Sequence, residues 1–258
     1  MIRVVVCGAC GRMGGLVVRQ MYRQRDMKLV SAIDAHDAPD IGKDAGELAG
    51  VGELGVVVVG ADKLAGILRQ TKPDVLVDFT NADASVQNIR VASEAGVSLV
   101  IGTTGFTAEQ LAEIERVIRG KNIRAVISPN MSVGVNVFFR LVEAAAKMLG
   151  NDYGVKIVEA HHVHKKDAPS GTAKKAAQIV AKALRRDEDS IKIKSIREGE
   201  VIGDHTVIFS TPLERVEVTH RAQSREIFAA GAVKAIRHVV EKGTPGVVQD
   251  MWDVLAIG

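Results

Sequence analysis

Short apolar runs alternate with helix-like segments through the first half of the chain, and this alternation constrains the fold more than any other feature. Residues 2–7 are β-branched and almost wholly apolar, as expected for a strand covered on both faces. Similar strands are expected at residues 28–34, 55–59, 75–79, 97–101 and 124–127. Helices are expected at residues 12–23, 63–70, 82–95 and 108–119. This order predicts an α/β fold with a Rossmann-like, doubly wound parallel sheet.

The rhythm changes near residue 128. Helices are expected at residues 133–149, 170–184 and 227–241, and strands at residues 156–163, 191–198, 205–210 and 215–219. Strands that follow each other directly are typical of a mixed or antiparallel sheet, so the second domain is expected to be α+β. We expect a first domain over residues 1–128 and a second over residues 129–239. The tail, residues 240–258, is expected to pack back on the first domain.

Composition excludes several classes of protein. The net charge of +3, from 34 basic and 31 acidic residues, is too small to favour nucleic-acid binding. No apolar run approaches the roughly 18 residues of a membrane span, and the first residues enter a strand rather than a signal peptide. Two cysteines make no disulfide framework. A cytoplasmic protein is therefore expected.

A glycine-rich turn, Gly8-Ala9-Cys10-Gly11-Arg12-Met13-Gly14, follows the first strand and opens the first helix. Glycines let the backbone approach a pyrophosphate, and the helix N-terminus supplies amide donors. The GxxGxxG spacing is a variant of the usual fingerprint, and a purely structural turn is the alternative. Asp34, twenty positions after Gly14, lies where an acid meets the adenosine ribose. Together these features predict a nicotinamide dinucleotide site.

Ala35 follows this acid, where an arginine would favour a 2′-phosphate. A carboxylate repels that phosphate, so NADH is expected to be favoured over NADPH. His36 and Lys43 can soften this preference, or can simply belong to a solvated loop.

Cys7 and Cys10 form a CxxC pair, which invites a redox or zinc interpretation. The chain has no second cysteine pair, and the glycine turn already explains this segment. We therefore expect Cys7 to end a buried strand and Cys10 to be a small side chain in the turn.

Three later strand ends also carry polar or small residues, at the sheet edge where ligands bind in open α/β folds. Asp78-Phe79-Thr80 ends one strand. Gly102-Thr103-Thr104-Gly105 ends the next, where backbone can approach the nicotinamide ribose; a helix N-cap at Thr104 or Thr107 is an additional interpretation. Ser128-Pro129-Asn130-Met131 is expected to contact the nicotinamide carboxamide.

Histidine and lysine cluster between Glu159 and Thr172. On a strand His162 and His164 share one face and His161 the other, which makes a three-histidine metal site awkward; no metal is expected. A structural cluster is a further alternative, although adjacent cations are costly without an anion. Pro169 is expected to start a helix and leave the amides of Ser170, Gly171 and Thr172 for a carboxylate. The segment therefore predicts a dicarboxylate site with a proton donor.

The whole chain resembles the 4-hydroxy-tetrahydrodipicolinate reductase (dihydrodipicolinate reductase) family of lysine and diaminopimelate biosynthesis. Besides Gly8–Gly14 and Glu159–Thr172, the resemblance includes Asp44–Leu48, Asp78–Thr80, Gly102–Phe106 and Pro129–Ser132. The Glu159–Thr172 segment is the specific part, because the other motifs are generic when taken alone.

This resemblance implies reduction of a cyclic imine by hydride transfer from NADH or NADPH, in a homotetramer built through the second domain. It implies His161 and Lys165 as catalytic residues, and His162, Gly171 and Thr172 as substrate ligands. The implied cofactor residues are Gly8, Ala9, Cys10, Gly11, Arg12, Met13, Asp34, Gly102, Thr103, Thr104, Ser128, Pro129, Asn130 and Met131. Two departures are Ala35 and Val163, at positions where some members carry basic side chains.

Two other functions remain open at this point. Another nicotinamide-dependent dehydrogenase is one, although thioester chemistry on an aldehyde needs a cysteine that the second domain lacks. A non-catalytic dinucleotide sensor is the other, although it would need neither the histidine-lysine cluster nor the expected anion site.

Overall fold

The computed structural model describes residues 1–257, which form two compact units. One unit comprises Met1–Ser132 with Phe228–Ala256, and the other comprises Val133–Ile227. The chain thus returns to the first unit at Phe228, eleven residues before the predicted end of the second domain at residue 239.

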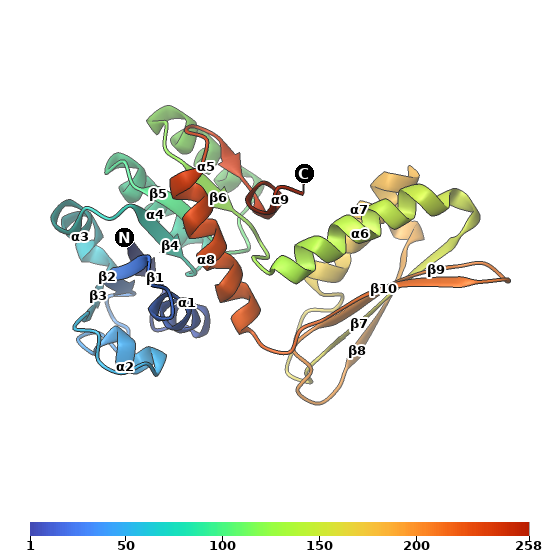
Figure 1. Cartoon of the computed structure of the whole chain (residues 1–258), viewed down its shortest axis with the longest axis horizontal. Helices are drawn as coiled ribbons and strands as arrows, with labels where there is room; N and C mark the ends of the chain where they lie inside the picture. The colour runs from blue at the N-terminus through green and yellow to red at the C-terminus, as the bar shows by residue number, and fades with distance from the viewer. Residues whose placement is uncertain (258) are drawn as a thin grey trace. The chain divides into compact units, whose positions relative to one another are not determined.

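The first unit is built on a seven-stranded sheet in the order β11-β6-β5-β4-β1-β2-β3 (Figure 1). Every neighbouring pair in it is parallel. Its strands are β1 (Ile2–Cys7), β2 (Met27–Asp34), β3 (Val58–Gly60), β4 (Val75–Asp78), β5 (Ser98–Ile101), β6 (Ala125–Ile127) and β11 (Val248–Gln249). After β1 the chain adds β2 and β3 on one side of the sheet, and after β4 it adds β5 and β6 on the other. A topological switch point therefore lies between β1 and β4.

Helices cover both faces of this sheet, because alternate strand residues point to opposite sides. Val4 and Val6 of β1 join the apolar cluster formed with α1 and α8, whereas Val5 joins the cluster formed with α3, α4 and α5. The helices are α1 (Arg12–Tyr22), α2 (Ala45–Ala49), α3 (Leu64–Thr71), α4 (Ala82–Glu94), α5 (Ala108–Lys121), α8 (Glu226–Glu241) and α9 (Met251–Leu255). The predicted Rossmann-like architecture is confirmed.

The second unit packs two helices against a four-stranded mixed sheet in the order β10-β9-β7-β8. Its elements are α6 (Val133–Leu149), β7 (Gly154–His161), α7 (Gly171–Leu184), β8 (Lys192–Arg197), β9 (Asp204–Ser210) and β10 (Arg215–Arg221). β7 is parallel to β8 and antiparallel to β9. The predicted mixed sheet is therefore also confirmed.

The register of this sheet gathers polar residues on its buried side. Ile157, Glu159 and His161 of β7 are buried and alternate with more exposed neighbours. Their partners on β9 are Val207 for Ile157 and His205 for Glu159. The buried face of β7 therefore carries an aliphatic side chain at Ile157 and ionisable side chains at Glu159 and His161.

Several local predictions were wrong. The expected strand over residues 156–163 ends at His161, so the strand alternation does not extend to His162 and His164. Ser170 caps α7, which begins at Gly171 rather than at Pro169. The short elements α2, β11 and α9 were not predicted from sequence, because each is shorter than a clear periodic pattern.

Among residues 1–257, no helix combines the length and the apolar character that crossing a bilayer requires.

Gly231 in α8 should be intolerant of a side chain, because a Cβ there would lie 1.7 Å from the carbonyl oxygen of Met131. We expect Gly231→Ala to lower the free energy of unfolding by about 3 kcal/mol, as overpacking does. Gly66→Ala is the matched control, since Gly66 is also helical and has no neighbour within 4 Å of a new Cβ. Urea unfolding should show Gly66→Ala unchanged or stabilised by about 0.5–1 kcal/mol. Equal effects of the two substitutions would contradict the packing account.

Candidate functional site

The glycine turn after β1 is built by close backbone contacts. Gly8 has φ of 78°, a left-handed conformation that favours glycine. A Cβ on Gly14 would lie 2.0 Å from the carbonyl oxygen of Gly8, so only glycine lets α1 pack this closely on the turn. Gly11 occupies the N-cap of α1 without a side-chain cap, and Arg12 and Met13 form its first turn. The helix N-terminus therefore remains open to an anionic ligand.

Asp34 ends β2 and its carboxylate is tied to the turn. Oδ2 accepts a hydrogen bond of 2.8 Å from the backbone nitrogen of Cys10, and Oδ1 accepts one of 2.8 Å from that of Ala35. The acid found by spacing therefore also holds the glycine turn in place. Lys43, considered above as a cation near the cofactor, pairs with Asp40 at 2.6 Å.

A pocket of about 200 Å³ lies at the switch point between β1 and β4. It is lined by residues from the glycine turn, from the ends of β1 to β4 and from α4 with its N-cap: Cys7, Gly8, Gly11, Ile33, Asp34, Ala35, Ala61, Phe79, Thr80, Asn81, Ala84 and Asn88. This is the position at which open α/β sheets bind ligands. The structure thus brings Gly8, Gly11 and Asp34 to one pocket.

Asp78 is completely buried at the end of β4 and organises the neighbouring strand ends. Its Oδ1 accepts hydrogen bonds from the hydroxyls of Thr103 at 2.6 Å and Thr80 at 2.7 Å, and its Oδ2 accepts one from Asn88 Nδ2 at 2.8 Å. Thr103 is therefore engaged with Asp78. A Cβ on Gly102 would lie 2.1 Å from the ring of Phe79, so glycine is needed for this packing.

The remaining sequence-predicted cofactor residues lie nearby in the first unit. Thr104 is exposed, whereas Thr107 is the N-cap of α5 and forms its capping box. The Ser128 hydroxyl donates to the carbonyl of Asn130 at 2.9 Å. Met131 is 2% exposed and belongs to the hydrophobic core. Ala9 and Pro129 carry no side-chain hydrogen-bonding group.

The CxxC pair has no feature of a reactive site. Cys7 is completely buried, and Cys10 is half-buried in the turn. Burial, reinforced by the nearby Asp34 carboxylate, raises the pKa of the Cys10 thiol to about 12. A thiol with such a pKa is protonated near neutral pH and is a poor nucleophile and metal ligand.

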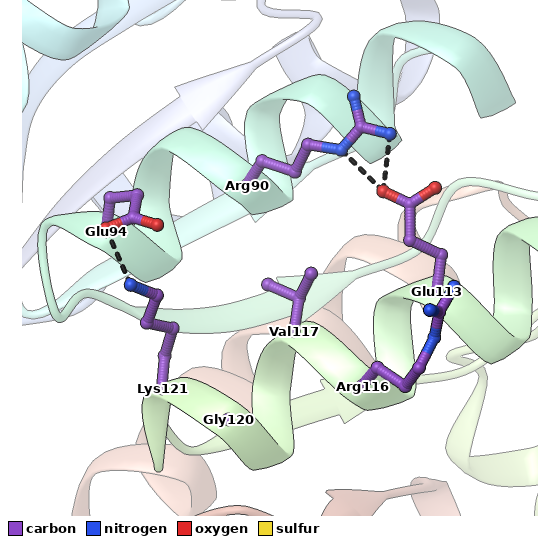
Figure 2. A pocket seen from close by; sticks show the side chains of 7 residues that line it. All are labelled: Arg90, Glu94, Glu113, Arg116, Val117, Gly120 and Lys121. Atoms are coloured by element: carbon purple, nitrogen blue, oxygen red, sulfur yellow. Dashed lines mark hydrogen bonds and ion pairs between the residues drawn. The ribbon is translucent and has the colours of Figure 1, made fainter.

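A larger pocket, of about 570 Å³, lies between α4 and α5 (Figure 2). Four of its five charged side chains pair across it: Arg90 with Glu113 at 2.5 Å and Lys121 with Glu94 at 2.8 Å. The two pairs lie at the surface and each neutralises its own charges, so size alone does not make this groove the functional site.

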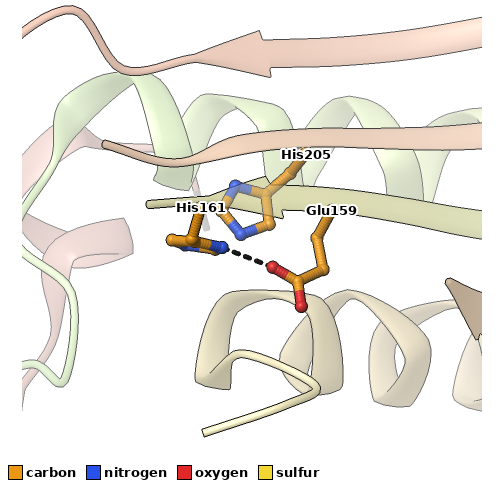
Figure 3. Close-up of side chains that lie close together, drawn as sticks. All are labelled: Glu159, His161 and His205. Carbon is orange, nitrogen blue, oxygen red and sulfur yellow. Dashed lines mark hydrogen bonds and ion pairs between the residues drawn. The ribbon is translucent and has the colours of Figure 1, made fainter. Parts of the chain in front are cut away.

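In the second unit the candidate site is centred on His161. Its Nδ1 is hydrogen-bonded to Oε2 of Glu159, two residues earlier on the same face of β7 (Figure 3). The other oxygen, Oε1, lies 3.0 Å from Nη2 of Arg197 on β8. Burial lowers the pKa of His161 below its usual value, against the opposing effect of Glu159. For Glu159, burial raises the pKa, but the neighbouring polar and cationic groups of Ser195, Arg197 and His161 outweigh it and the pKa is lowered.

His205 packs its ring edge against His161, with ring centroids 5.1 Å apart. Its Nε2 is 3.1 Å from the hydroxyl of Ser170, which accepts a hydrogen bond from the backbone nitrogen of Ala173 in α7. Burial, followed by repulsion from His161, lowers the pKa of His205 to about 3. His205 is therefore neutral at physiological pH and does not add a second charge beside His161.

The loop after β7 carries the remaining predicted residues. His162 donates its backbone N–H to the carbonyl of Val201 at 2.6 Å, and its Nε2 lies 3.3 Å from Nη2 of Arg225. The ammonium of Lys165 pairs with Asp167 at 2.8 Å. Gly171 and Thr172 form the first turn of α7, and its N-cap Ser170 accepts a hydrogen bond from the backbone nitrogen of Ala173.

The ligand atoms of Glu159, His161 and His205 lie within 4.8 Å of one another, a group of the kind that can hold a metal ion. This group differs from the histidines that cluster in the sequence, His161, His162 and His164. Arg197 already neutralises the Glu159 carboxylate, so the arrangement is better suited to controlling a proton on His161 than to attracting a cation.

Sequence reasoning missed the residues around His161. Glu159 could have been found, because a position two residues before His161 shares its face on a strand. Arg197, His205 and Arg225 come from later elements and are placed by strand register and tertiary packing. No spacing rule available in the sequence identifies them.

The stability of the protein should depend on pH through His205. The unfolded chain takes up a proton at this residue near pH 6.5, whereas the folded protein does so only near pH 3. The free energy of unfolding should therefore fall as pH decreases through this window, by up to about 1.4 kcal/mol per pH unit. Urea unfolding between these pH values should show a shallower decline for His205→Asn, with the exposed His36→Asn as the control. Identical slopes for wild type and His205→Asn would contradict the assignment.

Known proteins match this chain along its full length. Family models for the N-terminus and the C-terminus of dihydrodipicolinate reductase match residues 2–131 and 134–255. Proteins called 4-hydroxy-tetrahydrodipicolinate reductase from Methanothermobacter thermautotrophicus and Methanocaldococcus jannaschii are 47% and 48% identical to the chain, over 100% of its length and 100% and 98% of theirs.

A solved structure of dipicolinate-bound dihydrodipicolinate reductase from Paenisporosarcina is similar, with a TM-score of 0.80 and 26% identity over 98% of each chain. An amine dehydrogenase from Mycobacterium smegmatis shares the fold, with a TM-score of 0.68 at 16% identity over 96% of this chain and 94% of its own. The family models and the full-length relatives both lead to the same assignment. The chain belongs to the dihydrodipicolinate reductase family.

Proposed function

We propose that the chain reduces 4-hydroxy-tetrahydrodipicolinate to tetrahydrodipicolinate with NADH or NADPH, in the diaminopimelate route to lysine. The observation that carries this proposal is the site around His161. It combines a proton-exchanging histidine, the nearby Lys165 and the N-terminus of α7 within one segment. Family membership, through full-length relatives named for this reaction, supports the same substrate.

The first unit has the features of a dinucleotide site. The contacts of Gly8 and Gly14 leave a cradle that side chains would fill, and the adjacent pocket contains Asp34. We infer that Gly8–Met13 hold the pyrophosphate and that Asp34 contacts the adenosine ribose. The remaining cofactor contacts are assigned to Gly102, Thr103, Thr104 and to Ser128–Met131. A nicotinamide bound there supplies the hydride.

The second unit supplies the substrate-binding and proton-transfer groups. His161 gives the proton, and Lys165 stabilises negative charge that develops as hydride arrives. His162, Gly171 and Thr172 bind the substrate carboxylates, with the α7 N-terminus providing amide donors. The dicarboxylate named in the Paenisporosarcina structure has the charge and size that such a site would recognise. We also propose that the second unit mediates assembly into a homotetramer, through the sheet face opposite α6 and α7.

Removing the proposed catalytic groups should reduce turnover without weakening cofactor binding. We expect His161→Gln and Lys165→Ala each to lower kcat by about 10²–10⁴-fold, the usual contribution of a positioned proton donor or cation. The dissociation constant of NADH, measured by fluorescence titration, should remain unchanged. Lys166→Ala is the matched control, because Lys166 is the exposed neighbour of Lys165. Loss of NADH binding in either variant would argue against these roles.

Cofactor preference tests the Asp34-Ala35 pair. Steady-state reduction of freshly generated 4-hydroxy-tetrahydrodipicolinate should show higher kcat/KM with NADH than with NADPH. Ala35→Arg should raise the relative efficiency of NADPH by about 10–100-fold, because a guanidinium can pair with the 2′-phosphate. Ala35→Leu adds bulk without charge and should not produce this gain. Equal wild-type efficiencies would show that this pair does not determine selectivity, and no reduction with either cofactor would refute the proposed reaction.

A further inference from the structure

Glu159 is completely buried. Among the described groups that act on the charge of His161, it is the one that carries a negative charge. It lies on β7, and both of its oxygens are engaged, one with Nδ1 of His161 and the other with Arg197. Burying a carboxylate is costly, so its position requires these specific partners. The cost suggests a role in the chemistry of His161 beyond packing.

The contact determines which ring nitrogen of His161 holds a proton. A carboxylate can only accept a hydrogen bond, so Nδ1 must be the donor. Nε2 is then the nitrogen that can give or take a proton. Gly203 lies beside this second nitrogen, since a Cβ there would be 3.1 Å from Nε2. The absence of a side chain at residue 203 keeps Nε2 uncrowded.

The charged groups that face His161 come from several elements. Glu159 on β7 raises the pKa of His161, while burial, Lys165 in the following loop and Arg197 on β8 lower it, burial most strongly. His205 on β9 contributes a neutral ring. Glu159 is therefore the group in this set that favours the protonated, proton-donating form of His161.

Arg197 keeps Glu159 in place. Its guanidinium donates hydrogen bonds of 2.6 Å to the carbonyls of Asp167 and Ile196, so it is held from two other directions. A fixed guanidinium beside Oε1 leaves Oε2 directed at His161. Arg197, Glu159 and His161 thus form a continuous chain of contacts across β8 and β7.

We propose that Glu159 is a positioning residue that holds His161 with Nδ1 protonated, so that Nε2 delivers the proton to the substrate. The inference rests on the proposed reductase function. The 4-hydroxyl of 4-hydroxy-tetrahydrodipicolinate leaves as water, which gives a conjugated cyclic imine. In the step, this imine gains one hydride from the reduced nicotinamide and one proton from Nε2 of protonated His161, which yields tetrahydrodipicolinate and the oxidised nicotinamide. His161 is left neutral, with its remaining proton on Nδ1 facing Glu159.

The direct test is the tautomer of His161, observed by ¹⁵N NMR of histidine-labelled protein as a function of pH. The His161 signals are identified by their loss in His161→Gln. In the wild type, neutral His161 should carry its proton on Nδ1. In Glu159→Gln the Nε2-protonated tautomer should gain population, and the pKa of His161 should fall by about one unit. Glu188→Gln, an exposed substitution of the same kind in the second unit, should reproduce the wild type.

Kinetics give the second measurement. We expect Glu159→Gln to lower kcat by about ten- to a hundred-fold, as loss of an orienting partner does for other histidines. The decline of kcat at high pH should begin at a lower pH in Glu159→Gln than in the wild type. The reason is that His161 with a lower pKa loses its catalytic proton at a lower pH. A loss that is equal at every pH, with an unchanged tautomer, would mean that Glu159 is merely structural and would overturn the proposal.

A second variant and the wild-type tautomer separate a failure of the proposal from a failure of Glu159→Gln to fold. Glu159→Asp retains a negative charge opposite Arg197 but withdraws it from Nδ1, so it should fold and still show a mixed tautomer. A wild-type histidine protonated on Nε2 would reject the proposal even if every variant were unstable. If the wild type does not reduce the substrate, the proposed function fails, while the NMR result still decides the role of Glu159.

Discussion

A carboxylate buried without water must be surrounded by hydrogen-bond donors, and each unit of this protein is arranged around one such group. Asp78 in the first unit and Glu159 in the second are both 0% exposed. Asp78 draws together the hydroxyls of Thr80 and Thr103, which follow β4 and β5, and the amide of Asn88 in α4. Glu159 draws His161 and Arg197 together on neighbouring strands.

The two networks have different consequences because their donors differ. Asp78 is held by neutral hydroxyl and amide groups, so its network stiffens the sheet edge beside the glycine turn. Glu159 is held by a histidine and an arginine, so its network controls where a proton resides. The first arrangement suits a rigid seat for a cofactor, and the second suits a proton donor. This division agrees with a family of reductases that combine hydride and proton transfer.

The sequence predicted the parts of the fold that have a periodic signature. The apolar runs and their intervening helices identified the parallel sheet, and the strand-rich second half identified the mixed sheet. Short elements such as α9 lack such a signature. The end of β7 at His161 was also missed, because local sequence does not show where the partners β8 and β9 stop pairing.

Candidate site residues were predicted only where they share one segment or a known motif spacing. Gly8, Gly11 and Asp34 were found by spacing, and the structure brings them to one pocket. His161, Lys165 and Gly171 were predicted together because they belong to one segment. Arg197 and His205 could not be found, because their place beside His161 depends on a sheet register set by many packing contacts. Asp34 was found, but its hydrogen bond to Cys10 was not foreseen.

The central claim is that this chain adds a hydride from a nicotinamide to a cyclic imine dicarboxylate. The most direct measurement uses NADH carrying deuterium at both positions of nicotinamide C4, with freshly generated 4-hydroxy-tetrahydrodipicolinate. Mass spectrometry should find a single deuterium in the tetrahydrodipicolinate formed, in step with oxidation of the cofactor. Product without deuterium, or no oxidation of either NADH or NADPH in the presence of the substrate, would contradict the claim.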